Sequence, residues 1–263
     1  MSVIKSDKKR IVVKVGTSSL TYDTGKTNLK MIEKLVRVLS DLMNMGHEII
    51  LVSSGAIGVG VGKLGLPEKP STTRQKQALA AIGQASLMSI YEKFFMEYGY
   101  STGQVLLTKF VLDDEQRYES AKNAFETMID YGVIPIVNEN DVISTYEIEF
   151  GDNDTLSAYV ANLVDADILV ILSDIDGFYD GNPNDSGTKI IPVIEEITDE
   201  IRNCAGGEGT RRGTGGMITK LKAAELVCEN GIDMIITNGS TPENLYKVVS
   251  GDAVGTLFKK HSV

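Results

Sequence analysis

Seven short, mostly aliphatic runs recur along the chain and constrain its fold more than any other feature. They cover residues 11–15, 48–52, 104–107, 133–137, 168–172, 234–237 and 255–258. Strands that are apolar on both faces are typical of a parallel sheet covered on each side by helices, because both faces of such a sheet are buried. The runs therefore predict an α/β protein and exclude an all-helical one.

Segments with helical periodicity lie between most of these runs. In residues 28–45 the apolar side chains, beginning with Leu29, Ile32 and Leu35, repeat at intervals of three and four, which places them on one face of a helix. Similar patterns predict helices over residues 72–98, 116–131, 155–164, 217–229 and 242–248. We expect Thr241 to cap the last helix ahead of Pro242.

The alternation of strands and helices predicts one α/β domain over residues 1–263. The chain contains no repeat, low-complexity tract or linker that would divide it. Residues 174–192 are rich in Asp, Gly and Asn, and they predict a β-hairpin that projects from this domain.

The ionisable residues exclude several classes of protein. The 36 acidic and 26 basic side chains give a net charge of −10, which disfavours nucleic acid or an anionic membrane as the main partner. Two cysteines and two histidines are too few for a disulfide scaffold or an ordinary zinc site. Because no apolar stretch approaches the roughly 20 residues that span a bilayer, we expect a cytoplasmic protein with neither signal peptide nor membrane anchor.

Polar and glycine-rich segments follow several predicted strands, where the ligands of parallel sheets bind. Residues 14–19 and 53–58 offer small side chains and free amides to an anion. Short polar side chains gather in residues 138–141 and 151–154, and residues 203–216 form a glycine-rich loop ahead of a helix. Structural turns and N-caps have similar compositions, so these segments alone do not establish a site.

Lys14 is harder to explain as a structural residue. It interrupts an apolar strand between Val13 and Val15, and the ammonium group of a buried lysine is costly unless a fixed anion compensates its charge. We therefore interpret Lys14 as functional.

Common nucleotide and metal motifs are absent or misplaced. The chain has no G-x-x-x-x-G-K-[ST], and residues 60–65 fit G-x-G-x-x-G only beyond the end of a strand and without an acidic partner downstream. Residues 174–178 resemble a calcium loop, but Phe178 stands at a ligand position. We interpret His47 and His261 as structural or exposed, and predict no protein metal site.

Lysines, amide-rich loops and carboxylates remain as the chemical groups of the chain. Phosphoryl transfer needs no more than these, because positioning and cations stabilise its transition state. A carboxylate acceptor, with a pKa of about 4.3, is already ionised at pH 7 and needs no general base. The residues by themselves favour a kinase that acts on an acidic acceptor.

Six motifs, in this order along the chain, resemble the amino acid kinase family. They are KVGTS at 14–18, SSGAI at 53–57, PIVNEND at 135–141, FGDND at 150–154, SDIDGFY at 173–179 and GTGGMITK at 213–220. The combination of NEND with FGDND is characteristic of the glutamate 5-kinase branch. The resemblance implies a three-layer αβα sandwich on a mainly parallel sheet of about eight strands. It also implies ATP-dependent phosphorylation of the γ-carboxylate of L-glutamate, the first step toward proline.

The resemblance further implies roles for individual residues. Lys14 and Lys220 would stabilise the transferring phosphoryl group while Asp154 holds both lysines, so we expect Asp154→Asn to lower kcat and spare the fold. Glutamate would be bound by Ser54, Gly55, Asn138, Asp141, Asp152 and Asn153. The nucleotide would lie against Lys14, Gly16, Thr17, Ser173, Asp174, Thr214, Gly215, Gly216, Met217, Ile218, Thr219 and Lys220. Backbone amides of Gly16, Thr17 and Gly55 would line the phosphate path.

The resemblance extends to cofactors and partners. Mg²⁺ would be held mainly by oxygens of ATP, residues 1–165 would form the amino-acid side, and residues 166–263 would form the nucleotide side. Proline is a candidate feedback inhibitor, the next enzyme of the pathway is a candidate receiver of the product, and we expect a homo-oligomer. Many members carry a further C-terminal RNA-modification-type (PUA) domain, which we do not expect here.

Two alternatives stay open at this point. A sister kinase for N-acetylglutamate, aspartate or carbamate would share the lysines, but it would not need an anion aimed at a free ammonium group. A non-catalytic sensor on the same fold would be expected to lose Lys14, Lys220 or Asp154, and the chain has all three.

Overall fold

The computed structural model describes residues 8–22, 24–68, 70–144, 152–183, 185, 187–205 and 216–261. Within these residues, eight strands form one sheet in the order β3-β4-β2-β1-β5-β7-β8-β6. All neighbours are parallel except β7 and β8, which are antiparallel. The strands are β1 (Arg10–Val15), β2 (Glu48–Ser53), β3 (Thr102–Leu107), β4 (Ile134–Glu139), β5 (Ile168–Ser173), β6 (Val193–Ile194), β7 (Asp233–Asn238) and β8 (Thr256–Phe258).

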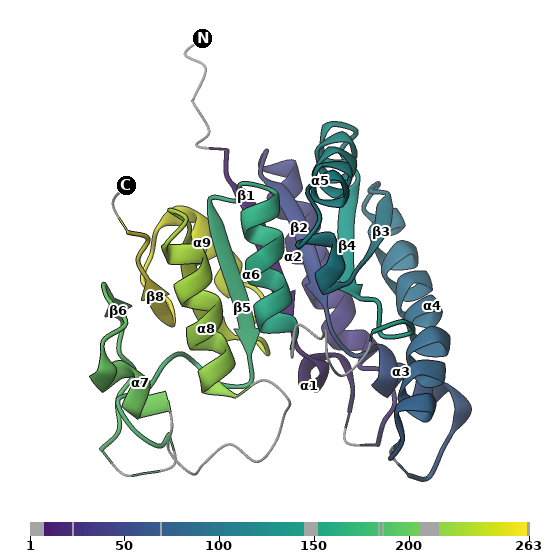
Figure 1. The fold of residues 1–263 in the computed structure, drawn as a ribbon, viewed down its shortest axis with the longest axis horizontal. Coiled ribbons are helices and arrows are strands. Elements are labelled where there is room, and N and C mark those ends of the chain that lie inside the picture. Colours follow the sequence, from purple (N-terminus) through teal and green to yellow (C-terminus); the bar gives the residue numbers. More distant parts are fainter. Residues whose placement is uncertain are drawn as a thin grey trace.

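Helices cover both faces of this sheet, which confirms the predicted α/β sandwich (Figure 1). One face packs against α5 (Glu115–Asp130), α6 (Asn153–Leu163), α7 (Asp199–Ala205) and α8 (Met217–Cys228). The other packs against α2 (Leu29–Asn44), α3 (Ala56–Leu64), α4 (Thr73–Glu97) and α9 (Asn244–Ser250). The short helices α1 (Thr17–Leu20) and η1 (Lys109–Val111) follow β1 and β3.

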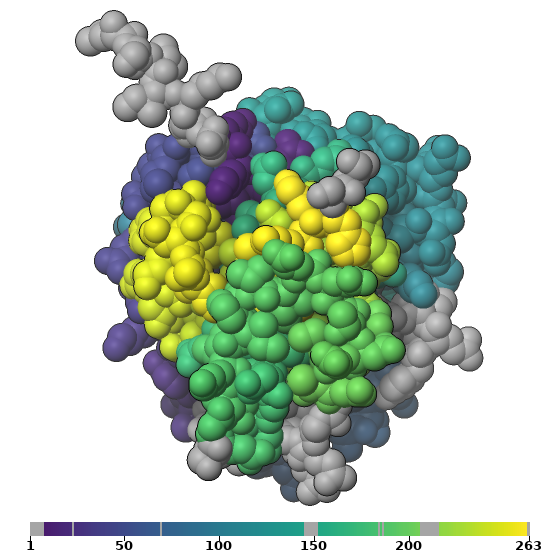
Figure 2. Space-filling model, turned by 90° about the vertical axis from the view of Figure 1, so that its left-hand side faces the viewer, coloured from purple at the N-terminus to yellow at the C-terminus, as the bar shows by residue number. Residues whose placement is uncertain are grey.

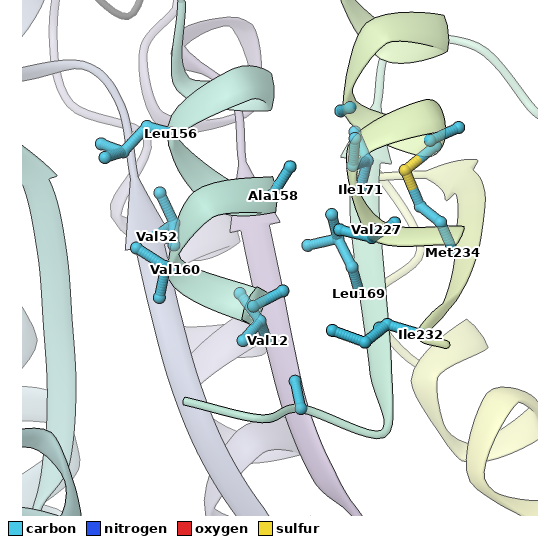
Figure 3. Packing of buried hydrophobic residues seen from close by; sticks show 14 of the residues in the cluster. Val12, Val52, Leu156, Ala158, Val160, Leu169, Ile171, Val227, Ile232 and Met234 are labelled. Carbon is cyan, nitrogen blue, oxygen red and sulfur yellow. The ribbon is translucent and has the colours of Figure 1, made fainter. Parts of the chain in front are cut away.

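Alternation along β1 divides the core into two layers. Ile11, Val13 and Val15 pack on the α2 side of the sheet, whereas Val12 packs with α6 and α8 (Figure 3). Successive side chains of a strand point to opposite faces, so Lys14 points to the same side as Val12. The period of the strand therefore directs Lys14 toward α6 and α8.

The order of the strands creates two switch points at the carboxyl edge of the sheet, where neighbouring strands lead to opposite faces. The next long helices after β1 and β2 are α2 and α3, on one face, whereas the next helices after β4 and β5 are α6 and α7, on the other. Where neighbouring strands lead to opposite faces, a crevice opens outside their carboxyl ends. The pairs β1–β5 and β2–β4 meet this condition, and α6 begins between them.

The β6 end of the sheet is short, because β6 contains only two residues. Figure 2 views the molecule from this side, where the green segment that includes α7 and the yellow C-terminal segment face the viewer. A short edge strand offers few free backbone groups for pairing with another chain.

The structure contains elements that the sequence patterns do not predict, namely α1, α3, α7, η1 and β6. The helix α3 was not predicted because it contains several glycines, and glycine has a low helix propensity. Two of these glycines allow close packing: a Cβ at Gly60 would overlap the carbonyl group of Leu79, and one at Gly62 would overlap that of Gly25. The G-x-G-x-x-G match at residues 60–65 is therefore a packing feature of α3.

Two predictions for the second half of the chain are wrong in detail. Thr241 does not cap α9, because residues 241–243 form a turn and the helix begins at Asn244, whose backbone N–H donates to the Thr241 carbonyl at 3.0 Å. In the described part of residues 174–192, the expected hairpin is reduced to a single antiparallel bridge between Tyr179 and Ile190.

Candidate active site

Three charged side chains meet at the carboxyl end of β1. Nζ of Lys14 lies 2.6 Å from Oδ1 of Asp154, and Nζ of Lys220 lies 3.0 Å from Oδ2 of the same carboxylate. Asp154 is fully buried, while Lys14 and Lys220 are 8% and 6% exposed. The structure thus brings together the three residues predicted to be catalytic.

Local structure explains why Asp154 is available for this contact. Asp152, rather than Asp154, is the N-cap of α6, and its Oδ1 accepts a hydrogen bond from the Thr155 backbone at 2.8 Å. Asp154 lies in the first turn of the helix, where a carboxylate is favoured by the helix dipole. Its side chain is therefore free to face the two lysines.

The electrostatics of this group keep the carboxylate ionised. Burial by itself raises the pKa of Asp154, but the positive charges of Lys14 and Lys220 and their hydrogen bonds outweigh it and hold the pKa below its ordinary value. The three side chains together carry a charge of +1. Such a group suits a site where negative charge is transferred.

The start of α8 adds further donors. Gly216 is its N-cap, and the Thr219 hydroxyl lies 3.2 Å from Oδ2 of Asp154 and donates to the Gly216 carbonyl at 2.7 Å. Met217 is half-buried and Ile218 is exposed. The amides of a helix N-terminus favour a phosphate group. Thr214 and Gly215, which were predicted to contact the nucleotide, lie outside the described residues.

A cluster of side-chain amides lies at the carboxyl ends of β2 and β4, and we call this place the acceptor crevice. Nδ2 of Asn153 donates to Oγ of Ser54 at 2.9 Å, to Oδ1 of Asn138 at 2.9 Å and to the Ser53 carbonyl at 3.2 Å. Nδ2 of Asn138 donates in turn to Oε1 of Gln84 at 3.0 Å. Three of the predicted glutamate-binding residues therefore come together, with Asn153 in contact with both Ser54 and Asn138.

The predicted phosphate-lining residues lie at helix starts beyond β1 and β2. Gly16 is the N-cap of α1, which begins at Thr17, and Gly55 is the N-cap of α3. Gly55 has φ +95°, a left-handed conformation that favours glycine. A Cβ at Gly16 would lie 3.7 Å from Nζ of Lys14, so this backbone passes close to the buried lysine.

Of the predicted nucleotide residues, Ser173 is the last residue of β5 and Asp174 follows it; β5 neighbours β1 on the side away from β2. Oγ of Ser173 donates to Oδ1 of Asp174 at 3.2 Å; Ser173 is buried and Asp174 is exposed. Gly239, after β7, donates its backbone N–H to the Ser173 carbonyl at 2.7 Å. A Cβ at Gly239 would lie 2.9 Å from Oγ of Ser19, so α1 closes against the ends of these strands.

Two other predicted glutamate-binding residues lie at the border of the amide cluster. Asp141 is half-buried in the turn after β4, where the backbone N–H groups of Ile143 and Ser144 both donate to the Asn140 carbonyl. Oδ1 of Asp152 caps α6, and its Oδ2 is buried without a hydrogen-bond partner among the described residues. That buried oxygen is available to a donor on a ligand.

The sequence reasoning missed two residues that support the site from α4. Gln84 contacts Asn138, and the hydroxyl of the fully buried Tyr91 lies 2.9 Å from Oγ of Ser53. Both residues lie on one face of the helix, seven positions apart. In the sequence, the position of Gln84 among apolar residues of the helix predicted over residues 72–98 was the signal that could have indicated its role.

Within the described ranges, no cluster of His, Cys, Asp and Glu side chains forms a metal site. In the same ranges, every helix is too short or too polar to cross a bilayer.

Comparison with known proteins identifies close relatives. A model of the amino acid kinase family matches residues 9–238. The chain is 58% identical over 257 residues to the glutamate 5-kinase of Clostridium perfringens, with 96% of both chains covered. It is 54% identical over 250 residues to the glutamate 5-kinase of Thermoanaerobacter sp. (strain X514), and the match covers 95% of this chain and 67% of that protein.

Solved structures with the same fold are more distant in sequence. Carbamate kinase from Giardia lamblia bound to AMP-PNP superimposes with a TM-score of 0.69 at 19% identity, over 97% of this chain and 100% of that chain. The isopentenyl phosphate kinase of T. acidophilum in its product complex gives a TM-score of 0.65 at 17% identity, over 95% and 100%. These two structures show the fold alone. With the sequence relatives, they establish that the chain belongs to the amino acid kinase family and, within it, to the glutamate 5-kinases.

Proposed function

We propose that the chain transfers the γ-phosphoryl group of ATP to the γ-carboxylate of L-glutamate, the first step of proline biosynthesis. The observation that carries the proposal is the buried Lys14–Asp154–Lys220 group at the carboxyl edge of the sheet. The glutamate 5-kinases to which the chain is 58% and 54% identical also support the proposal.

The two lysines suit the transferring group. A phosphoryl group in transfer carries negative charge on its equatorial oxygens, and fixed cations in a water-poor site stabilise this charge. Asp154 holds both ammonium groups before substrate arrives, so little reorganisation is needed during the reaction. Backbone amides at Gly16, Gly55 and Gly216 would hold the phosphates along the same edge.

The acceptor would bind in the crevice between β2 and β4. Asn153 and Asp154 are consecutive residues of α6, and the first contacts the amide cluster while the second contacts the lysines. This adjacency would place the γ-carboxylate of a bound glutamate near the phosphoryl group. The carboxylate attacks as an ionised oxygen, so the reaction needs no general base.

Mg²⁺ is expected to accompany ATP and to neutralise charge on the phosphates. ATP oxygens and water would supply most of its ligands, as is usual for Mg²⁺ in kinases. In this proposal residues 1–165 form the amino-acid side of one domain and residues 166–263 form the nucleotide side.

Three further properties belong to the proposal. Proline would act as a feedback inhibitor, the glutamyl phosphate would pass to the next enzyme of the pathway, and the chain would work as a homo-oligomer in the cytoplasm. The resemblance to the glutamate 5-kinase branch supports each of these. A reactive acyl phosphate also favours rapid consumption of the product.

A hydroxylamine trap tests the reaction itself. Acyl phosphates react with hydroxylamine to give hydroxamates, so ATP-dependent hydroxamate formation should be measured with L-glutamate, N-acetylglutamate and L-aspartate. We expect product from L-glutamate alone. Equal or greater rates with N-acetylglutamate or aspartate would assign the chain to a sister kinase, and the absence of product with all three would favour a non-catalytic sensor.

Asp141 provides a sharper test of substrate choice. We propose that its carboxylate faces the α-ammonium of glutamate, which N-acetylation would replace with an uncharged amide. The mismatch should cost about 2–4 kcal/mol, or roughly thirtyfold to a thousandfold in kcat/KM. Asp141→Asn should raise KM for glutamate far more than KM for ATP, and an unchanged glutamate KM would refute this role.

A further inference from the structure

We infer that Gln84 is a positioning residue that fixes the orientation of the amides in the acceptor crevice and so sets the affinity for the amino-acid substrate. The inference rests on the proposed function. Gln84 lies on α4, contacts Asn138 and is 8% exposed.

The direction of each amide in the cluster follows from one fixed acceptor. The backbone carbonyl of Ser53 can only accept, so the amide nitrogen of Asn153 must face it. Nδ2 of Asn153 then requires an oxygen from Asn138, which turns Nδ2 of Asn138 toward Gln84. Gln84 must present its oxygen to complete the chain. The four residues therefore allow a single arrangement of donors and acceptors.

This arrangement determines what the crevice presents to a ligand. Because Nδ2 of Asn153 is directed to the protein, Oδ1 of Asn153 points the other way and is available as an acceptor. An acceptor in this place suits the ammonium group of an amino acid. Without the oxygen of Gln84, Nδ2 of Asn138 loses its acceptor and only the donor from Asn153 still orients the Asn138 amide. If Asn138 then flips, its Nδ2 and that of Asn153 oppose each other as two donors.

The backbone of α4 holds Gln84 at the depth that this contact needs. At the preceding residue, Gly83, a Cβ would overlap the carbonyl oxygen of Ala56, so α4 lies directly against the start of α3. Tyr91, about two turns further along the same face of α4, contacts Ser53. The helix α4 thus contacts residues at the carboxyl ends of both β2 and β4.

The contact should affect the amino acid and not the nucleotide. Asp154 is held by Lys14 and Lys220, and no amide of the cluster takes part in those ion pairs. Loss of the Gln84 oxygen should therefore weaken glutamate binding while the phosphoryl-transfer group stays intact.

Two variants of Gln84, one apolar and one a shorter amide, test the contact. Gln84→Met keeps the side-chain volume and removes the acceptor oxygen. Gln84→Asn keeps the amide, but its side chain is one methylene shorter and the oxygen lies further from Asn138. Each should raise KM for glutamate about tenfold, with KM for ATP and kcat within about twofold, as expected when one buried hydrogen bond is lost. Ser86→Ala is the control on the same helix: it removes a hydroxyl that contacts Lys63 and the Ile82 carbonyl and none of the amides, and it should leave the glutamate KM within about twofold.

A double-mutant cycle separates positioning from a structural role. In an Asn138→Leu background, Gln84→Met should add no further increase in glutamate KM, because Gln84 acts through Asn138. Additive effects, or equal rises in the KM of glutamate and ATP, would overturn the inference. If the Met variant fails to fold, as judged by its thermal melt, the Asn variant gives the same decision. The parent chain decides the proposed function separately, since that proposal fails only if the parent makes no glutamate-dependent hydroxamate.

Discussion

At the scale of single residues, Lys14 shows how a charge inside an apolar strand is compensated by a residue of another element. Its neighbours on the adjacent strands are Val52 and Ile171, which offer no partner. The side chain is instead held by Asp154 of α6, in the helix layer toward which Lys14 points. A buried ammonium group is tolerated because this carboxylate compensates it.

The first prediction concerns the two lysines. Lys14→Met and Lys220→Met keep much of the side-chain length and remove the charge, so each should lower kcat about a hundredfold or more while KM for ATP changes much less. Steady-state kinetics with both substrates varied would measure this. Lys222→Met, on the exposed side of α8, is the control and should leave kcat unchanged. Near-normal kcat in the Lys14 variant would contradict the assignment.

The second prediction concerns Asp154 and pH. Its complete burial between two lysines changes the expectation that Asp154→Asn would spare the fold, because removing one partner of a buried ionic group costs roughly 3–5 kcal/mol. The pKa of Asp154 is lowered in the folded state, so its stabilising effect is fully present above the ordinary value of 3.8 and is lost as the pH falls through the lowered value.

Urea unfolding of the parent chain and Asp154→Asn between pH 7 and pH 3 would measure this difference. The gap in unfolding free energy should be constant from pH 7 to about pH 5 and should begin to shrink near pH 4. A gap that grows with acidification would have the wrong sign and would refute the ionised state of Asp154.

At the scale of elements, the pairing of α3 with α4 shapes the floor of the acceptor crevice. The two helices pack through glycines, at Gly60 against Leu79 and at Gly83 against Ala56. Helix propensity alone disfavours glycine in both helices, so close packing is the reason for its presence. The same closeness brings Gln84 and Tyr91 to the ends of β4 and β2.

The third prediction tests this packing. Gly83→Ala should reduce the unfolding free energy by about 1–3 kcal/mol, because the new methyl group would overlap the Ala56 carbonyl and force the helices apart. Gly58→Ala is the matched control: it is also helical, and its Cβ would lie 3.5 Å from methyl groups of Thr17 and Thr21, so it should be neutral or stabilising. Equal stability of the two variants in urea would contradict the packing argument.

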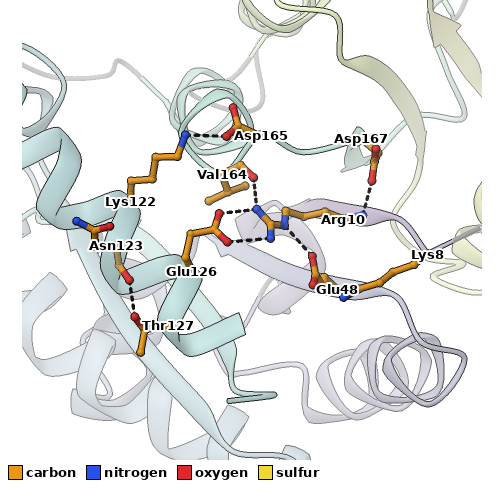
Figure 4. A network of polar contacts seen from close by, with 10 residues as sticks. All are labelled: Lys8, Arg10, Glu48, Lys122, Asn123, Glu126, Thr127, Val164, Asp165 and Asp167. Atoms are coloured by element: carbon orange, nitrogen blue, oxygen red, sulfur yellow. Dashed lines mark hydrogen bonds and ion pairs between the residues drawn. The ribbon is translucent and has the colours of Figure 1, made fainter. Parts of the chain in front are cut away.

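At the scale of the whole molecule, the carboxyl and amino ends of the strands carry different groups of polar residues. The carboxyl edge carries the candidate site, and the amino edge carries a polar network centred on Arg10 (Figure 4). Arg10 pairs with Glu126 of α5 at 2.6 and 3.0 Å, with Glu48 of β2 at 2.8 Å, and donates to the Val164 carbonyl at the end of α6 at 2.6 Å. One side chain of β1 thus connects three other elements.

The fourth prediction tests whether the Arg10 network contributes to stability and not to the activity of the candidate site. Arg10→Met should lower the unfolding free energy by about 2 kcal/mol, since it breaks several charge-assisted hydrogen bonds at a side chain that is 18% exposed, and should leave kcat within about twofold. Lys122→Met, which breaks only the exposed Lys122–Asp165 pair in the same network, should cost less than about 1 kcal/mol. A large loss of kcat in folded Arg10→Met would show instead that the amino edge controls the site.

The amino-acid sequence by itself determined the class of fold and the type of chemistry. Aliphatic runs predicted seven of the eight strands in the described part of the chain, and helical periodicity predicted the long helices, because burial acts on each segment locally. A lysine in an apolar strand marked Lys14, and the family motifs supplied Lys220, Asp154 and the amides of Asn138 and Asn153.

Only the tertiary structure decided which of these residues meet. Sequence patterns report whether a residue is buried, but they carry no information on which distant residue faces it, and so the contact of Gln84 with Asn138 and the network of Arg10 were not predicted. The helix α3 was hidden for the same reason: its glycines oppose helix formation locally and are favoured only when α4 packs against them. Contacts between segments far apart in the chain override local propensity where two backbones must approach closely.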